Sequence, residues 1–426
     1  MRTVTKKPAG YRQVSISTAT RRLLCDFAAG DAKRPLRRAD VNWEAAFRRI
    51  CRDGLLGLTY RYLSRGETRD YPPEEFRQHI QIAYHASLIR LTYLYHNLGY
   101  VLAHLKTHGL ECLVIKGPAV ACTVYPHPTL RFFTDLDLVV RERDLVAAHR
   151  LLVEIGFNPQ QDQPPPPAKL VPQAVLHHLS YLQPQTGLMV EVHYDDLLNA
   201  GLVSRDLDGF WMRARRIAIE NVPVKVLSPE DQLIHLCAHA HAHGYSRLNW
   251  FSDLAFILRE RAGQLDWDHV IETLHLEEAQ VSGYYTLYFL ERLLGVAAPR
   301  GVLDALRPDR FRRWWHTRLL PEAQVLSLQP TGLAFGLHVI PLFRQLLPDV
   351  LIMGRRRDKL PFLFRLLLPP ATWLKYYYRL DNPLQIPLYY LLHPLKLVYH
   401  YLAEVVPILA RIRQWYRHKR PHRSPV

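Results

Sequence analysis

The stretch FFTDLDLVV, residues 132–140, decides the fold of this chain, because it is an apolar strand that carries two aspartates one residue apart. Side chains alternate between the two faces of a strand, so Asp135 and Asp137 point to one face while Leu136 and Leu138 point into the core. Two neighbouring carboxylates repel each other, and a divalent cation is the commonest way to offset that repulsion. The pair therefore predicts a magnesium site on a largely buried strand.

The segment before this strand, LECLVIKGPAVACTVYPHPTLR at residues 110–131, predicts a short strand that turns into a short helix. The turn is Lys116-Gly117-Pro118, in which Gly117 lets the backbone approach a ligand and Pro118 suits a first helical turn. Exposed N–H groups at a helix start, beside a lysine, favour the binding of phosphate oxygens. Arg131 offers a second cation four residues before Asp135.

A third carboxylate follows in GLMVEVHYDD, residues 187–196, where Met189, Glu191 and His193 share one face of an expected strand. Three acidic groups can hold two metal ions. Two ions roughly 3.5–4 Å apart activate an attacking hydroxyl and stabilise a leaving pyrophosphate. The three acidic residues therefore predict phosphoryl or nucleotidyl transfer.

These motifs resemble those of the DNA polymerase beta-type nucleotidyltransferase superfamily. More closely, the chain is similar to a bacterial nucleotidyltransferase family of unknown substrate, which carries a Lys-Gly turn, a Tyr-Pro…Arg stretch, Asp-x-Asp and Glu-x-His. Here these are IKGPA, Tyr125-Pro126 with Arg131, DLDLVV and VEVHY. A helical segment, HLCAHAHAHGYSRLNWFSDL at residues 235–254, extends the resemblance to roughly residues 75–260.

The resemblance implies that Asp135 and Asp137 bind two magnesium ions and that Glu191 completes the metal site. It also implies that Lys116 and Gly117 hold the triphosphate of a nucleoside triphosphate. The wider superfamily usually has Gly-Gly or Gly-Ser in the turn, whereas this chain has Gly-Pro, which lacks one backbone donor and a hydroxyl.

Each assignment has a structural alternative. An Asp-x-Asp pair without these neighbours would be a loop feature or a cap of the next turn. Lys116 can be a solvated strand-end lysine, and Arg131 can be a structural partner of Asp135 instead of a nucleotide contact. His193, expected to bind nucleotide, can instead donate a hydrogen bond to Glu191.

Three histidines form a rival motif, because His235, His239 and His243 recur every four residues and would line one face of a helix. Such spacing can hold zinc. The cluster contains no glutamate to act as a catalytic base and no cysteine pair, and the segment continues through Trp250 and Asp253 as a packing helix. Structural or substrate-facing histidines are therefore favoured over a zinc site.

Composition indicates a folded chain, since 426 residues at 48% hydrophobic content can bury large cores in two or three structural units. The five cysteines are odd in number and scattered, which favours reduced core thiols. The amino terminus has no apolar stretch after its basic residues. These features predict a cytoplasmic protein.

The periodicity predicts an α+β fold, in which a small mixed sheet forms a nucleotidyltransferase core between N-terminal and C-terminal helical regions. We expect a helical region at 1–108, the catalytic core at 109–226, a helical domain at 227–348 and a basic aromatic region at 349–426. Expected helices cover 18–29, 42–63, 73–107, 144–155 and a segment from 228. Expected strands cover 112–115, 134–140, and a hairpin that runs from 175 to 182, turns at 184–187 and returns through 191. A proline-rich loop, residues 160–170, precedes the hairpin.

The last part of the chain is basic, aromatic and broken by prolines, and its apolar stretches are too short for a spanning helix, which needs about 20 residues. Such a segment can contact an anionic bilayer surface, a lipid-linked acceptor or another subunit, or it can be a helical cap on the core with a frayed basic tail from Arg411. The formal net charge of +16 also raises nucleic acid, which ranks third because no known nucleic-acid-binding motif is present.

Together these observations predict a magnesium-dependent nucleotidyltransferase that moves a nucleoside monophosphate to an acceptor hydroxyl and releases pyrophosphate. Glu191 would also help to deprotonate the acceptor, and Lys116 and Arg131 would neutralise the triphosphate. The alternative is a weakly catalytic or non-catalytic binding protein of the same fold, located at a membrane or in a biosynthetic complex. The nucleotide base, the acceptor and the oligomeric state are not fixed by the sequence.

Overall fold

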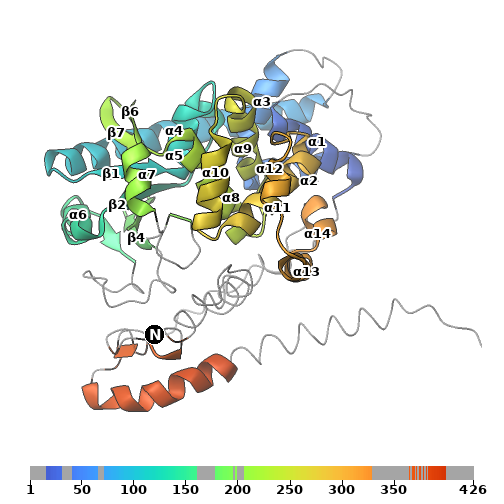
Figure 1. Cartoon of the computed structure of the whole chain (residues 1–426). Coiled ribbons are helices and arrows are strands. Elements are labelled where there is room, and N and C mark those ends of the chain that lie inside the picture. The colour runs from blue at the N-terminus through green and yellow to red at the C-terminus, as the bar shows by residue number, and fades with distance from the viewer. Residues whose placement is uncertain are drawn as a thin grey trace, which may run out of the picture.

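A computed structural model of the chain describes residues 16–30, 41–65, 72–160, 178–194, 197–198, 206–328, isolated positions between 364 and 380, and 382–399. The described residues form a mixed sheet surrounded by helices (Figure 1). The proline-rich loop beyond residue 160, the first residues of the expected hairpin at 175–177 and the basic tail from Arg411 lie outside the described residues.

The sheet has seven strands in the order β3-β4-β5-β2-β1-β7-β6. Parallel pairing joins β2 to β5 and β1 to β7, while the other neighbours are antiparallel. The strands are β1 Cys112–Ile115, β2 Asp135–Val140, β3 Asn158–Pro159, β4 His178–Gln183, β5 Leu188–His193, β6 Arg215–Ile219 and β7 Val222–Val226. The central strands β2 and β5 are the two that carry the acidic residues.

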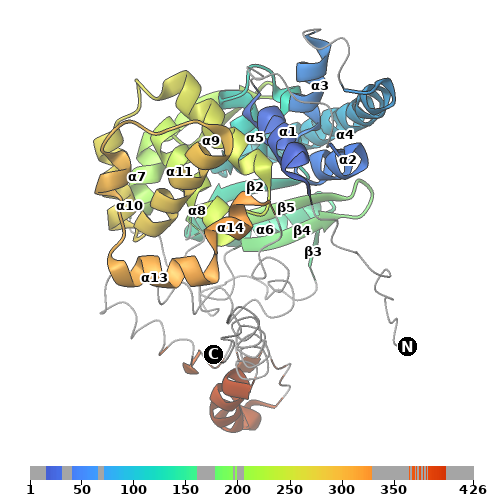
Figure 2. The ribbon, with the colours of Figure 1, turned by 90° about the vertical axis from the view of Figure 1, so that its right-hand side faces the viewer.

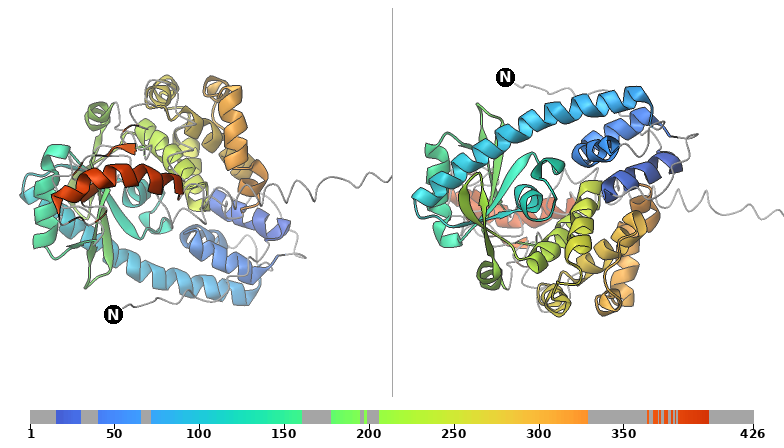
Figure 3. Two further views of the ribbon diagram at one scale, coloured as in Figure 1. Left: turned by 90° about the horizontal axis from the view of Figure 1, so that it is seen from below. Right: turned by 90° about the horizontal axis from the view of Figure 1, so that it is seen from above.

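Alternation along the strands divides the interior into two apolar cores. Leu136, Leu138 and Val140 face one core, together with Val190 and Val192 of β5. The helices α4 (Glu74–Thr107) and α6 (Leu145–Glu154) cover this face of the sheet. The second half of α4 belongs to this core and its first half to the other, so α4 spans both (Figure 3).

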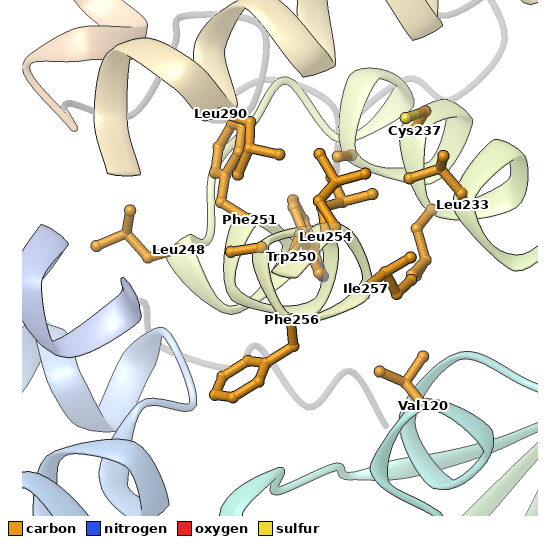
Figure 4. Close-up of a cluster of buried hydrophobic side chains, with 14 of the residues drawn as sticks. Val120, Leu233, Cys237, Leu248, Trp250, Phe251, Leu254, Phe256, Ile257 and Leu290 are labelled. Carbon is orange, nitrogen blue, oxygen red and sulfur yellow. The ribbon is translucent and has the colours of Figure 1, made fainter. Parts of the chain in front are cut away.

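The opposite core lies among the remaining helices and includes Val139 from β2. Its centre is α9, whose apolar side chains reach α8, α11 and the short helix α5 (Figure 4). The helices concerned are α1 Thr18–Ala29, α2 Trp43–Arg52, α3 Leu56–Ser64, α5 Lys116–Thr123, α7 Leu207–Arg213, α8 Pro229–Ala242, α9 Leu248–Arg261, α10 Trp267–Leu276, α11 Gln280–Leu294, α12 Val302–Ala305, α13 Arg310–Leu319 and α14 Glu322–Leu326. Figure 2 shows this bundle beside the strands. The polar face of β2 thus looks toward the helices of this core.

Local signals explain most helix ends. Ser17 caps α1 by accepting a hydrogen bond from the backbone N–H of Thr20, and Gly30 ends that helix in the left-handed region at φ 67°. Ser228 caps α8 in the same way, with Pro229 in the first turn. The expected helices at 18–29, 73–107 and 144–155 and the expected strands at 112–115 and 134–140 are confirmed to within one residue at each end.

Two details of the expected fold were wrong or missing. The single helix expected at 42–63 is two helices, because Gly54 adopts φ 69° between α2 and α3 and breaks the helical path. The edge hairpin of β6 and β7 has no counterpart among the expected strands. The α+β class with a mixed sheet between helical regions is confirmed, whereas the division into four regions stays a prediction.

Near the C-terminal end, residues 386–399 form a helix. This helix contacts the segment before it: Nδ1 of His393, in the helix, lies 2.8 Å from the hydroxyl oxygen of Tyr378. Among the described residues, none of the helices is both long and apolar enough to span a bilayer.

Candidate active site

The register of the two central strands brings the three predicted carboxylates together. Asp137 is directly opposite Glu191 in the parallel pair of β2 and β5, and Asp135 lies two residues earlier on the same face of β2. On the other side of β2, Ile115 at the end of β1 is opposite Asp137. The site is therefore built on the ends of three adjacent strands and does not depend on a loop to bring the acids together.

Lys116 follows β1 directly and reaches the same carboxylates. Its Nζ lies 2.6 Å from Asp137 Oδ1, and its side chain is largely buried. Its backbone has φ 53°, a left-handed conformation that costs a residue with a Cβ about 1–2 kcal/mol. The strained turn directs the ammonium group at the aspartate strand, and the ion pair offsets the strain.

The charges of the cluster are unevenly shared. Burial alone would raise the pKa of Asp137, but Lys116 and the hydrogen bond from His193 hold that pKa well below its usual range. Burial and the charge of Asp137 raise the pKa of Glu191 to about 8 and also raise the pKa of Asp135. Burial would lower the pKa of Lys116, yet Asp137 and Glu191 raise it. One lysine therefore faces more negative charge than it can neutralise.

Gly117 has a packing role that the sequence did not reveal. A Cβ at this position would lie 2.6 Å from the Cβ of Phe133, two residues before the Asp-x-Asp strand. The left-handed backbone conformation falls on Lys116, and Gly117 instead allows close contact between the turn and the residues that lead into β2. Its expected contact with the triphosphate stays a prediction.

Arg131 is buried and forms a bidentate ion pair with Asp253 of α9. Its Nε and Nη2 lie 2.7 Å and 2.9 Å from the two carboxylate oxygens, and the Tyr125 hydroxyl donates to the same carboxylate at 2.7 Å. Burial would lower the pKa of Arg131, but Asp253 raises it. These contacts clamp residues 125–131 onto α9, while direct contact of Arg131 with a nucleotide stays a prediction.

His193 lies on the carboxylate face, as its position in β5 predicts. Its Nε2 is 3.1 Å from Asp137 Oδ1 and 4.0 Å from Glu191 Oε2. A second histidine, His178 of β4, places its Nε2 3.6 Å from Glu191 Oε1. His178 was missed by the sequence reasoning, although counting back across the 184–187 turn from His193 pairs the two residues.

The three helical histidines line one side of α8, as their spacing predicts. The ring centroids of His235 and His239 lie 6.3 Å apart, those of His239 and His243 lie 4.5 Å apart, and Trp250 packs against the last two. Burial lowers the pKa of His235 to about 4, followed by the charge of Lys116. Within the described ranges, these histidines do not belong to any group of three potential metal ligands.

Arg247, an exposed residue just before α9, is a further cation that the sequence reasoning missed. Its charge lowers the pKa of Asp135, which is otherwise raised by burial and by Asp137. Only the tertiary fold brings residue 247 to the strand that carries Asp135. It therefore adds an exposed positive charge near the carboxylate cluster.

A mixed sheet whose central strands present Asp-x-Asp and a third acid beside a strand–helix turn defines the nucleotidyltransferase class. The chain belongs to the family described as uncharacterised nucleotidyltransferase, whose profile matches residues 39–295. The five cysteines all lie in described parts of the chain and are free thiols; Cys25, Cys112 and Cys237 are buried as expected of core thiols, whereas Cys122 is partly buried and Cys51 is exposed.

Comparison with solved structures gives looser likenesses. One is the solution structure of the antibiotic-resistance factor ANT(2'')-Ia, at 12% identity and a TM-score of 0.32, covering 47% of this chain and 98% of that chain. Another is the crystal structure of an antigenic nucleotidyltransferase-like protein from Paracoccidioides brasiliensis, at 16% identity and a TM-score of 0.30, covering 49% of this chain and 95% of that chain. No curated protein matches the chain.

Proposed function

We propose that this protein is a magnesium-dependent nucleotidyltransferase that moves a nucleoside monophosphate from a nucleoside triphosphate to an acceptor hydroxyl and releases pyrophosphate. The observation that carries the proposal is the register of β2 and β5, which sets Asp137 opposite Glu191 with Asp135 on the same face. Family membership supports nucleotidyl transfer in general, and the magnesium dependence and the reaction rest on the geometry.

The donor set fits magnesium. Carboxylate oxygens are the ligands that this ion prefers. Burial, followed by the charge of Asp137, raises the pKa of Glu191 and Asp135, and a bound cation would stabilise the ionised carboxylates. Asp135, Asp137 and Glu191 would hold two ions. When bound, the ions would activate the acceptor hydroxyl and neutralise the charge that develops on the pyrophosphate.

The protein residues have distinct tasks in this proposal. Asp135 and Asp137 position the nucleotide through the ions, and Glu191 also helps to remove the proton of the acceptor hydroxyl. Lys116 contacts Asp137, so its ammonium group lies beside the proposed metal site and would bind the triphosphate. Arg131 holds its segment against α9 through Asp253, and the open side of the site receives the charge of Arg247.

Calorimetric titration tests this proposal. Each of the four nucleoside triphosphates is titrated into the full chain, with and without magnesium, and into the Asp135→Ala/Asp137→Ala variant. We expect magnesium-dependent binding of at least one nucleotide and its loss in the variant. A matched control is Asp268→Ala, which removes an exposed carboxylate from α10 and should bind as the unchanged chain does. Failure of every nucleotide to bind would overturn the proposal.

A second role is favoured by one observation, the exposed apolar stripe on the helix of residues 386–399. Leu388, Leu391, Leu395 and Val398 are spaced at three and four residues and are each more than half exposed. The region 349–426 also has 14 lysines and arginines against 4 aspartates and glutamates. We propose that this helix attaches the protein to an anionic membrane surface, where leucines enter the interface and cations meet the headgroups.

Co-sedimentation with vesicles tests the attachment. The full chain should pellet with vesicles containing phosphatidylserine and much less with phosphatidylcholine alone, and Leu391→Glu/Leu395→Glu should abolish pelleting. The control Ile82→Glu/Ile89→Glu adds the same charges at exposed apolar positions of α4 and should leave pelleting unchanged. Equal pelleting of both variants would show that the stripe is not the attachment site.

A further inference from the structure

A second set of potential metal ligands lies beside the three carboxylates. It consists of His178, Glu191 and His193, whose ligand atoms all lie within 4.8 Å of one another. No other group of three in the described part of the chain meets this condition. The set shares Glu191 with the acidic cluster but adds two imidazoles that the reaction proposed above does not require.

Strand pairing fixes these three side chains on one face. His178 is directly opposite His193 in the antiparallel pair of β4 and β5, and Glu191 lies two residues before His193. The imidazole ring centroids of His178 and His193 lie 5.1 Å apart. Because all three residues sit on paired strands and not on a loop, the sheet holds them in place before any ligand binds.

The depth of the set suits an ion that is held by protein on one side and open on the other. The side chain of His193 is 2% exposed, that of Glu191 is 18% exposed and that of His178 is 35% exposed. The exposed fraction of the side chain therefore rises from His193, through Glu191, to His178. A metal bound there would keep positions for water or substrate.

The donor atoms select a different class of ion from magnesium. Two imidazole nitrogens and one carboxylate form the ligand set typical of divalent manganese, iron, cobalt or zinc, whereas magnesium favours oxygen ligands. His178 Nε2 lies 3.6 Å from Glu191 Oε1, and His193 Nε2 lies 4.0 Å from Glu191 Oε2, so each carboxylate oxygen lies near one of the two rings. Small rotations of three side chains would bring these atoms to one ion.

His193 links this set to the aspartates. Its Nε2 is also 3.1 Å from Asp137 Oδ1, the atom that Lys116 contacts at 2.6 Å. A single ring nitrogen cannot donate a proton to Asp137 and also give its lone pair to a metal ion. Metal binding by His193 would therefore release Asp137 from one of its hydrogen-bond partners.

We propose that His178, Glu191 and His193 form a binding site for a divalent transition metal ion that prefers nitrogen ligands, next to the carboxylate site of Asp135 and Asp137. The active centre would then take unlike ions: a hard ion on the aspartates and, in place of the second magnesium ion proposed above, a transition metal on Glu191 and the two histidines. This assigns His193 a ligand role in place of a nucleotide contact. The metal site is defined without the proposed reaction, but its place in catalysis rests on that reaction.

Cobalt is the direct probe, since Co²⁺ bound to imidazole and carboxylate has a visible absorption band that Mg²⁺ cannot produce. The full chain, freed of metal with a chelator, is titrated with Co²⁺ and followed by absorption. We expect one site that equimolar Mg²⁺ does not displace. His178→Ala should weaken Co²⁺ binding by at least about tenfold. The control His104→Ala removes a partly exposed histidine of α4 and should bind as the unchanged chain does.

A measurement on the unchanged chain guards against a variant that fails to fold. Pulsed electron spin resonance of bound Mn²⁺ or Cu²⁺ detects coupling to directly ligated nitrogen, and two histidine nitrogens are expected. Absence of nitrogen coupling, or Co²⁺ binding that His178→Ala leaves unchanged in a folded variant, would overturn the proposal. Histidine-dependent Co²⁺ binding in a chain that binds no nucleotide would keep this metal site and refute the nucleotidyl transfer. Asp135→Asn should lose magnesium-dependent nucleotide binding and keep the cobalt band.

Discussion

The segment 116–137 takes part in two ion pairs, Arg131 with Asp253 and Lys116 with Asp137, and the two pairs balance charge in opposite ways. Arg131 meets a single carboxylate, Asp253, through two bonds, and both groups are buried. Lys116 contacts Asp137 alone, while Glu191 and Asp135 add two more acids to its surroundings. The first pair is closed and satisfied, which is typical of a structural support. The second has surplus negative charge and an open side, which is typical of a site that binds a cation.

The comparison also explains why one fold needs both. Tyr125 and Arg131 bond to the same carboxylate of α9, and Lys116 follows β1 directly. The segment from Lys116 to Arg131 is therefore held to β1 at its start and to α9 at its end. The uncompensated negative charge lies on Asp135, Asp137 and Glu191. The buried Arg131–Asp253 pair stabilises the backbone that leads into the aspartate strand and can offset the cost of that charge. Changing the Lys116–Asp137 pair should therefore affect mainly activity, and changing the Arg131–Asp253 pair should affect mainly stability.

The largest effect is expected from Asp137→Asn, which should lower nucleotidyl transfer by about a thousandfold, since metal-ion stabilisation of a transition state is worth several kcal/mol. The thermal midpoint should fall only slightly, because asparagine keeps the size of aspartate and an oxygen for Lys116, although it loses the charge that Lys116 and His193 favour. Rate and thermal unfolding are measured on the same preparation. Transfer that persists at the original rate would mean that the site is wrongly assigned.

Arg131→Met should give the opposite result. It leaves Asp253 buried without its partner, which costs about 3–5 kcal/mol of folding free energy. Urea denaturation measures the loss, and Arg131→Met/Asp253→Leu should recover much of it because no buried charge is left. If Arg131→Met instead kept its stability and lost nucleotide affinity, Arg131 would be the direct phosphate contact that the sequence predicts.

Gly117→Ala tests how the turn of Lys116 is joined to the aspartate strand. The added methyl group would meet the Phe133 side chain at 2.6 Å, and overpacking of this kind costs about 1–3 kcal/mol. Phe133→Ala lowers stability on its own, but the two changes together should cost less than the sum of their separate costs. Additive losses in urea denaturation would show that the turn can move away from Phe133.

A pH effect is expected from two histidines, the buried His316 and the partly buried His241, which have no acidic partner among the described residues. The rings of His241 and His316 stack 5.3 Å apart, and His316 stacks on Tyr285 at 3.4 Å. Burial lowers the pKa of His241 to about 4 and lowers that of His316 further. Both rings bind protons more weakly in the folded chain than in the unfolded chain. Stability is therefore complete above pH 6.5 and is lost as the pH falls toward about 4.

At pH 5, protonation of these histidines in the unfolded chain should lower the free energy of unfolding by up to about 2 kcal/mol for each histidine, at 1.36 kcal/mol per pKa unit. Thermal midpoints between pH 7 and pH 5 measure the loss. His316→Phe keeps a ring on Tyr285 and should make the dependence shallower. A dependence that His316→Phe leaves unchanged would assign the acid sensitivity to other groups.

Sequence patterns that act over a few residues were sufficient for much of the fold. Period-two alternation placed Asp135 and Asp137 on one strand face, and the caps at Ser17 and Ser228 set two helix starts. Where a local signal was misjudged, as at Gly54, one expected helix became two. The hairpin of β6 and β7 escaped prediction although Val222, Val224 and Val226 alternate along β7, because each strand is only 5 residues long.

The sequence by itself determined which residue types lie on the acidic strands, and it predicted that Glu191 and the aspartates belong to one site. Only the tertiary structure decided the partners. It paired Arg131 with Asp253, 122 residues away, and set His178 beside Glu191 and Arg247 near Asp135. The physical reason is range. Alternation and capping act between near neighbours, whereas the partner of a buried charge depends on which distant elements pack together.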